Sequence, residues 1–298
     1  MIDLHMHTIF SDGRINDISS IVKICNVMAI TDHNTIQSNK YYSDILGKVK
    51  HFIGCEVTVD ASPDYLIYFF SNKYLYDIES NLRELRESEE NAIKWCYHDL
   101  GYDSWESDKE QSFASYQKIR SMQTKNLAAI IHFYNADLKK LGCQFDLSDL
   151  KTARNARRKY RTEVGNTIPV DFAFQLAGKF DGEIVLAHPI HTSIKLCSRD
   201  LTNRTVIINK LDKLLESFVE HSGTTIEWEY MSPELLSRYE LENDIKAIRQ
   251  WLWRKANSLS MKYTIGSDAH DIQGQYAARC WLCNSELLLE GKLADWIQ

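Results

Sequence analysis

The chain has 298 residues, 44% hydrophobic and 26% charged, which is typical of a globular protein with one large or two small domains. Its net charge of -6 excludes a general nucleic-acid coat but allows a short anionic substrate bound by a local patch. No apolar run approaches the ~18 residues that cross a bilayer, and Asp3 and His5 come too early for a secretory leader. The seven cysteines are scattered and are expected to be reduced thiols. Together with the missing apolar run and leader, they predict a cytoplasmic protein without a membrane partner.

The first residues carry the densest group of potential metal ligands. A short strand is predicted over residues 2–5, and His5 and His7 follow one another at a spacing of two. Because alternate side chains of a strand share a face, both imidazoles can reach one ion if the chain stays extended to residue 7. Asp12 follows within a Ser-Asp-Gly stretch, which suits a turn that folds its carboxylate back over the strand end.

The next segment alternates between a predicted helix and predicted strands. Apolar residues at helical spacing predict a helix over 14–25. Three apolar stretches then predict strands, and ligand-type side chains stand where the first two end, as in α/β sheets that build sites at one edge. The strands are 27–31, which runs into Asp32 and His33, then 51–57, which contains Glu56, and 65–70.

Residues 76–175 differ in character from the rest of the chain. They show helical periodicity, many charges and no strong strand signal, which predicts a helical insertion subdomain. One predicted helix carries an arginine stripe that includes Arg154, Arg157 and Arg158 on one face. Two interpretations stay open: a clamp for substrate phosphate, or a solvated face that pairs with acidic stretches such as 84–90.

Strand and helix signals alternate again in the last third of the chain. Seven strand candidates alternating with helices predict a parallel sheet, and ligand-type residues at most strand ends favour a closed barrel over an open sheet. The predicted strands are 182–187, which ends before His188, 224–229, which contains Glu227 and Glu229, and 262–265, which runs towards Asp268 and His270; the predicted helices are 207–221 and 233–259.

These strand ends together predict a metal centre. Clustered imidazoles and carboxylates are costly to bury unless metal ions or partners neutralise them. A ligand set without thiolate favours manganese, iron or zinc, and its size predicts two or three divalent ions. Such ions suit the hydrolysis of phosphate esters. The candidate ligands are His5, His7, Asp12, His33, Glu56, His188, Asp268 and His270.

Successive short motifs in the chain resemble those of the PHP (polymerase and histidinol phosphatase) family of metal-dependent phosphoesterases. They occur in the family's order across nearly the whole chain. The motifs are His5-x-His7, Ser11-Asp12-Gly13, Thr31-Asp32-His33, Gly54-Cys55-Glu56, Ala187-His188-Pro189 and Gly266-Ser267-Asp268-Ala269-His270.

The resemblance implies a distorted seven-stranded (β/α) barrel formed by residues 1–75 and 176–298, interrupted by the insertion at 76–175. It also implies a trinuclear site. By motif, the first ion would be held by His5, His7, Glu56 and Asp268, the second by Glu56 and His188, and the third by Asp12, His33 and His270.

One position departs from the family pattern. The family supplies a further histidine for the second ion on the strand after the Gly-x-Glu motif, whereas residues 64–69 contain none. We expect Tyr65 or Leu66 to occupy that place, which would leave the second ion weakly bound or absent. Asp60 and Asp64 are the nearby carboxylates that could compensate.

The insertion resembles that of the family branch that acts on nucleoside monophosphates and 3',5'-bisphosphates, which predicts a nucleotide substrate. Trimming of short RNA, hydrolysis of histidinol phosphate and binding without turnover are the alternatives. Asp32 and His191 are the predicted catalytic residues beside the ions, although Asp32 also suits a turn or helix cap. Lys195, with Arg154, Arg157 and Arg158, is predicted to contact substrate phosphate, and Glu227 or Glu229 to hydrogen-bond a ligand or the substrate.

Overall fold

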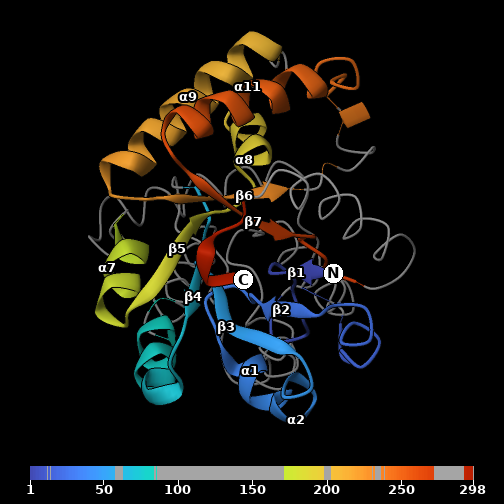
Figure 1. Ribbon diagram of the computed structural model, residues 1–298, viewed down its shortest axis with the longest axis vertical. Coiled ribbons are helices and arrows are strands. Elements are labelled where there is room, and N and C mark those ends of the chain that lie inside the picture. Colours follow the sequence, from blue (N-terminus) through green and yellow to red (C-terminus); the bar gives the residue numbers. More distant parts are fainter. Residues whose placement is uncertain are drawn as a thin grey trace, which may run out of the picture.

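The computed structural model places seven strands in one sheet that follows the order of the sequence (Figure 1). It describes residues 1–11, 13, 15–57, 63–83, 85, 171–197, 203–229, 231, 236–237, 239–271 and 292–297. The strands are β1 (Ile2–Asp3), β2 (Val27–Ile30), β3 (Lys50–Val57), β4 (Tyr65–Phe69), β5 (Gly182–Leu186), β6 (Thr225–Glu229) and β7 (Lys262–Gly266).

The sheet closes on itself where its last strand meets its first. The amide of Leu4 donates a hydrogen bond to the carbonyl of Ile265 at 2.9 Å, and Met6 forms a parallel bridge with Ala269. The chain therefore stays extended beyond β1, although only Ile2–Asp3 pairs with β2. The predicted α/β fold with a seven-stranded barrel is confirmed.

Strand β4 departs from the predicted parallel arrangement. It runs antiparallel to both β3 and β5, whereas the other neighbouring pairs are parallel. Only seven residues separate β3 from β4, too few for the crossover that a parallel pair requires. As a result the beginning of β4, rather than its end, lies at the edge of the barrel where the other strands end.

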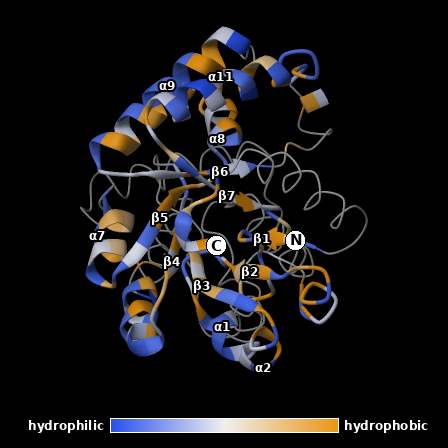
Figure 2. Ribbon diagram, in the orientation of Figure 1, coloured by the Kyte–Doolittle hydropathy of each residue, from blue (hydrophilic) through white to orange (hydrophobic). Residues whose placement is uncertain are grey.

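Helices cover the outside of the barrel. In Figure 1, α9 (Arg204–Glu220) and α11 (Ile245–Ser258) lie side by side across β6 and β7, and α7 (Phe172–Lys179) covers β4 and β5. Figure 2 shows hydrophilic and hydrophobic residues alternating along α9 and α11, because each helix buries one apolar face. The remaining short helices are α1 (Gln37–Tyr41), α2 (Ser43–Leu46) and α8 (Pro189–Lys195), with 3-10 turns at Asn72–Tyr74 and Asp295–Ile297 and a helical stretch over 75–83.

The helix predicted over 14–25 is wrong for the described part of that segment. Residues 19–24 form successive turns, and Ile15 is held extended by a bridge to Thr8. Asp17 accepts a hydrogen bond from the amide of Ser19, a local contact that competes with helix formation. The apolar residues of this segment are nevertheless buried against β2, so the pattern identified a packing surface rather than a helix.

The structure also bears on the predicted ends of one helix and of the insertion. The helix predicted over 233–259 is shorter: within its described part, turns precede α11, which begins at Ile245. Most of the predicted insertion, residues 76–175, falls outside the described residues, so the domain boundaries stay a prediction. Within the described residues no helix is both long and apolar enough to cross a membrane, and Cys25, Cys55 and Cys197 form no disulfide there.

Candidate metal centre

The extended chain beyond β1 carries His5 and His7 to one buried point inside the barrel. Both side chains are fully buried, and their Nε2 atoms lie 3.1 Å apart. Each imidazole thus faces the same place, as the spacing of two along an extended chain predicts. Neither is an isolated packing histidine, because carboxylates and further imidazoles surround the pair.

Glu56, near the end of β3, lies between four imidazoles. Its Oε2 atom is 3.6 Å from His5 Nε2, 3.3 Å from His7 Nε2 and 3.0 Å from His33 Nδ1. Its Oε1 atom is 3.0 Å from His188 Nε2. Burial raises the pKa of Glu56, but the surrounding imidazoles outweigh burial and hold that pKa well below its usual value. Glu56 therefore presents a charged carboxylate to both sides of the cluster.

Asp268 approaches the same histidine pair from the loop after β7. Its Oδ1 atom lies 3.5 Å from His5 Nε2 and 3.3 Å from His7 Nε2. The backbone of Asp268 has a φ of 48°, a left-handed conformation that aspartate tolerates better than most residues. Burial opposes ionisation, but His5 and the other imidazoles hold the pKa of Asp268 well below its usual value.

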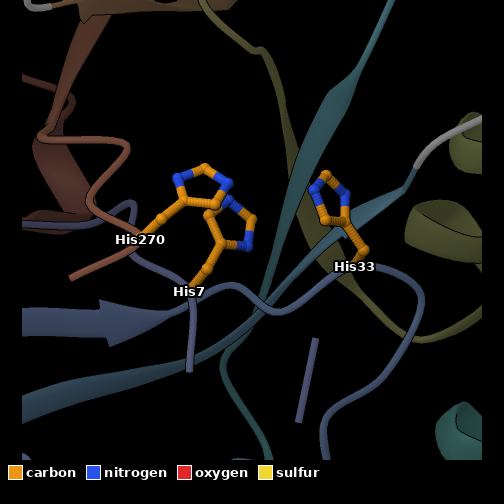
Figure 3. Close-up of side chains that lie close together, drawn as sticks. All are labelled: His7, His33 and His270. Atoms are coloured by element: carbon orange, nitrogen blue, oxygen red, sulfur yellow. The ribbon is translucent and has the colours of Figure 1, made fainter. Parts of the chain in front are cut away.

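A third group forms where three loops meet. Figure 3 shows the imidazoles of His7, His33 and His270 close together, and the ring centroid of His7 lies 4.5 Å from those of both His33 and His270. The Nδ1 atom of His270 is 3.0 Å from the carbonyl oxygen of Asp268. A hydrogen bond from Nδ1 to that carbonyl would put the proton of a neutral His270 on Nδ1 and make Nε2 the nitrogen with the lone pair that an ion requires.

The described residues thus offer three groups of candidate metal ligands. Within each group, all the ligand atoms lie within 4.8 Å of one another. The groups are His5, Glu56 and His188; His5, His7 and Asp268; and His7, His33 and His270. The Oε2 atom of Glu56 is buried and, although imidazole nitrogens of His5, His7 and His33 lie nearby, none of the described residues donates it a well-aligned hydrogen bond. A buried carboxylate oxygen without such a bond is costly, and a divalent ion would satisfy it. The donor set, with imidazole and carboxylate but no thiolate, suits manganese, iron or zinc.

Glu227 on β6 holds two of these histidines from behind. Its Oε1 atom accepts a hydrogen bond from His5 Nδ1 at 2.8 Å, and its Oε2 atom accepts one from the amide of His188 at 2.7 Å. Burial alone would lower the pKa of His5, but the carboxylates of Glu227 and Asp268 raise it well above its usual value. Because a carboxylate only accepts, Nδ1 of His5 bears a proton in this contact, and Nε2 faces Glu56.

Asp32 holds the loop that follows His7. Its carboxylate accepts hydrogen bonds from the Thr8 amide at 2.7 Å, the Thr8 hydroxyl at 2.8 Å and the Ser11 hydroxyl at 2.7 Å. The Ser11 hydroxyl lies 3.2 Å from His7 Nδ1. Asp32 therefore reaches His7 through Ser11, and Asp12, the next residue, lies outside the described residues.

Glu229, two residues after Glu227 on β6, anchors the start of α8. Its Oε1 atom accepts hydrogen bonds from the amides of Ile190 at 2.6 Å and His191 at 3.2 Å. Burial raises the pKa of Glu229 to about 7, and the nearby charge of Glu227 adds to that rise. The imidazole of His191 lies beside that of His188, with ring centroids 5.5 Å apart. This contact places His191 next to the cluster.

Two further buried carboxylates were not among the predicted ligands or catalytic residues. Asp3 accepts hydrogen bonds from the amide and hydroxyl of Ser267, at 2.9 and 2.8 Å, and so ties the chain beyond β7 to β1. The sequence signal for Asp3 was its position two residues before His5, which puts both side chains on the same face of an extended segment. Asp64, considered only as a compensating carboxylate, has its Oδ2 atom 3.7 Å from His188 Nε2.

The two residues expected in the place of the family's histidine face opposite sides of the barrel wall. Tyr65 points out of the barrel and packs against Phe174 and Phe218. Leu66 pairs with Glu56 across the two strands and is fully buried. Asp64 is the residue of this stretch that faces His188. Some predicted site residues lie outside the part of the chain that the structure describes. They are Asp12, Arg154, Arg157, Arg158 and the side chain of Lys195.

The chain matches no protein-family model and no curated protein sequence. It is similar in structure to a Bifidobacterium adolescentis protein assigned as a metal-dependent phosphoesterase, with 19% identity, a TM-score of 0.50 and coverage of 91% of this chain and 87% of that one. It is also similar to an amidohydrolase from Chromobacterium violaceum, determined with bound sulfate and no metal, with 18% identity, a TM-score of 0.53 and coverage of 91% and 88%. At these identities the likeness shows the barrel fold.

Proposed function

We propose that this chain is a metal-dependent phosphoesterase of the PHP type that hydrolyses phosphate monoesters. The observation that carries the proposal is Glu56, a buried carboxylate whose two oxygens face separate groups of imidazoles. A carboxylate in that position can bridge two ions. Bound divalent ions would lower the pKa of a water molecule towards neutral pH and offset charge on the phosphoryl oxygens.

The candidate ligands would be shared among three ion positions. His5, His7, Glu56 and Asp268 would hold the first ion, and His5 and Asp268 are already aimed at one point. Glu56 and His188 would contribute to the second ion. Asp12, His33 and His270 would hold the third, with the imidazoles of His33 and His270 on either side of His7.

The remaining predicted residues would position ligands or substrate. Asp32 would act on His7 through Ser11, as a positioning residue. His191 follows His188 at the start of α8, where its imidazole could donate a hydrogen bond to a phosphate oxygen. Lys195 ends the same helix and would contribute a second positive charge. These roles follow from sequence position and from the contacts of α8 with Glu229.

Within phosphate monoesters we propose a nucleotide as the substrate. This finer assignment rests on the resemblance of the insertion at 76–175 and on the arginine stripe. Arginine binds phosphate oxygens in pairs, so a stripe of arginines would suit the second phosphate of a bisphosphorylated nucleotide or the backbone of short RNA. A test of the stripe compares the double charge reversal of Arg157 and Arg158 to glutamate on a nucleotide and on a small generic ester. The clamp predicts a raised KM for the nucleotide alone.

The test of the proposed function is product release from a substrate panel. Mono- and bisphosphorylated nucleotides, histidinol phosphate, short RNA and a set of simple amides would be incubated with the chain and Mn²⁺, then with excess chelator. The proposal expects phosphate release from a monoester that the chelator abolishes, and loss of that release in His7→Ala with the fold intact. Hydrolysis of amides alone would overturn it, as would metal binding without any turnover. An exposed histidine variant, His221→Ala, is the control and should keep full activity.

A further inference from the structure

We infer that Asp64 is a ligand of the second ion, so that this position is completed by a carboxylate instead of a histidine. The ion position itself belongs to the proposed function, on which this inference rests. Asp64 is outside the three groups of ligand atoms described above, and the sequence offers it only as one of two nearby carboxylates, with Asp60.

The direction of β4 brings Asp64 to the centre. Because β4 is antiparallel to its neighbours, the residue before its first strand position lies at the edge of the barrel where β3 and β5 end. Leu66 pairs with Glu56 across the two strands, and Asp64 stands two residues before Leu66. Alternate residues along an extended chain share a face, so Asp64 faces the inside of the barrel beside Glu56.

The backbone of Asp64 is fixed to the segment that carries His188. The amide of Ala187, the residue before His188, donates a hydrogen bond to the carbonyl of Asp64 at 3.0 Å. The Asp64 residue is only 3% exposed, so its carboxylate is held among the ligand side chains rather than in solvent. Its place beside His188 therefore follows from strand pairing rather than from a flexible loop.

The separation of the two side chains suits shared coordination better than a direct hydrogen bond. Asp64 Oδ2 lies 3.7 Å from His188 Nε2, beyond the usual range of about 2.7–3.2 Å for such a bond. Two ligand atoms that are each about 2.1 Å from one ion lie roughly 3.0–3.6 Å apart at bond angles of about 90–120°, and the observed 3.7 Å lies just above that range. His188 Nε2 is also 3.0 Å from Glu56 Oε1, so this imidazole nitrogen has a carboxylate oxygen of Glu56 and one of Asp64 near it.

A carboxylate in this place changes the character of the ion position. Imidazole suits zinc, copper, iron and nickel, whereas carboxylate oxygens suit magnesium, calcium and manganese. With Glu56 and Asp64 both contributing oxygen, the second position is expected to prefer Mn²⁺ over Zn²⁺ more strongly than a position with two imidazoles. The second negative charge also offsets more of the ion's charge, which makes the buried position less costly.

The test counts ions bound to the full-length chain. Equilibrium dialysis against Mn²⁺ followed by elemental analysis gives the number of ions per chain and their dissociation constants. Asp64→Asn keeps the shape of the side chain, and Asp64→Ala removes the ligand. Both are expected to weaken one Mn²⁺ site by at least about tenfold and to leave the others unchanged. Asp64→His places an imidazole there; it should restore the number of ions and shift that site's preference towards Zn²⁺.

Controls and outcomes separate this inference from the proposed function. Asp295→Ala removes an exposed aspartate that pairs with Lys262 on the surface and should bind ions as the wild type does. Unchanged stoichiometry and affinity in both Asp64→Asn and Asp64→Ala would overturn the inference and leave the phosphoesterase proposal standing. Loss of one site in those variants, in a wild type that hydrolyses no phosphate ester, would uphold Asp64 and overturn the proposed function. A wild type that binds no ion would overturn both.

Discussion

His5 Nδ1 lies 2.8 Å from Glu227 Oε1, and both side chains are buried inside the barrel. The second oxygen of the same carboxylate accepts the amide of His188. One glutamate therefore sets the tautomer of one candidate ligand and the backbone position of another. Because both of its oxygens are used, the contact cannot be replaced by a group with a single acceptor.

Replacing Glu227 by glutamine should weaken metal binding. Glutamine has only one acceptor oxygen, so either His5 or the His188 amide loses its partner, and the charge behind His5 disappears. A contact of this kind is typically worth about 10–100-fold in metal affinity. Titration calorimetry with Mn²⁺ would measure the change, and Glu216→Gln, an exposed glutamate on α9, is the control. Equal affinity in wild type and Glu227→Gln would show that Glu227 does not orient the ligands.

Gly266, at the end of β7, leaves the space that this contact needs. A Cβ atom at Gly266 would lie 2.1 Å from Glu227 Oε1 and 2.2 Å from His5 Cβ. Gly266→Ala should therefore displace both side chains, destabilise the fold by about 1–3 kcal/mol and reduce metal binding. Gly178→Ala is the matched control, because a Cβ there meets nothing within 4 Å and the helix α7 should gain up to about 1 kcal/mol. Urea unfolding measures both, and a neutral Gly266→Ala would contradict the prediction.

Sequence reasoning picked out candidate ligands that the structure brings together, because their spacing reports local geometry directly. His5 and His7 lie two residues apart on an extended chain, and His188 and Asp268 follow recognisable strands. The positions of such groups depend on where strands end, which hydrophobic stretches define closely. Glu227 and Glu229 were also placed on one face by the same rule, and both turn inward.

Features that depend on tertiary pairing could not be derived in this way. The direction of β4 is set by its short connection to β3 and by its pairing with β5. That direction decides at which edge of the barrel Asp64 lies and that it faces the inside. The segment around Ile18 and Ile21 has the apolar spacing of a helix but is held in turns by a bridge at Ile15 and a local contact of Asp17. In both places the sequence pattern predicted which residues are buried, but it did not predict the path of the backbone.

Removing metal should destabilise the wild type more than a variant that lacks a shared ligand. His7 belongs to two of the three ligand groups, so His7→Ala should lose most of the stabilisation that Mn²⁺ confers. An ion at 100 times its dissociation constant adds about 2.7 kcal/mol to the free energy of unfolding. Thermal unfolding with Mn²⁺ and with chelator measures the difference for wild type, His7→Ala and the exposed control His221→Ala. A wild-type midpoint that does not respond to chelator would count against a bound ion.

Replacing Asp32 should disturb the site through the loop that it holds. In Asp32→Ala, the Thr8 amide and the Thr8 and Ser11 hydroxyls lose a buried acceptor, at about 1–3 kcal/mol for each donor left unpaired. If Asp32 only positions His7, kcat should fall while the pH dependence of kcat keeps its shape. The exposed Asp44→Ala is the control. A changed pH profile in Asp32→Asn, which keeps most of the contacts, would instead assign a proton-transfer role to Asp32.

Glu229 should make the metal-free chain less stable as the pH rises towards neutrality. Its pKa is about 7 in the folded chain against an ordinary value of 4.5, because burial and the charge of Glu227 outweigh His188 and the amides of Ile190 and His191. The folded state then binds the proton more tightly than the unfolded state, so stability declines between about pH 4.5 and 7. The full shift corresponds to roughly 3 kcal/mol.

Glu229→Gln removes this titration while keeping the acceptor oxygen at the start of α8. Urea unfolding of the chelated chain from pH 4.5 to 7.5 would measure the slope of stability against pH in wild type and variant, with the exposed Glu220→Gln as control. We expect Glu229→Gln to lose less stability than wild type across this range, so that the difference between the two grows as the pH rises. Parallel curves for wild type and Glu229→Gln would mean that Glu229 already ionises at its ordinary pKa, and that the amides at the start of α8 offset the cost of burying its charge.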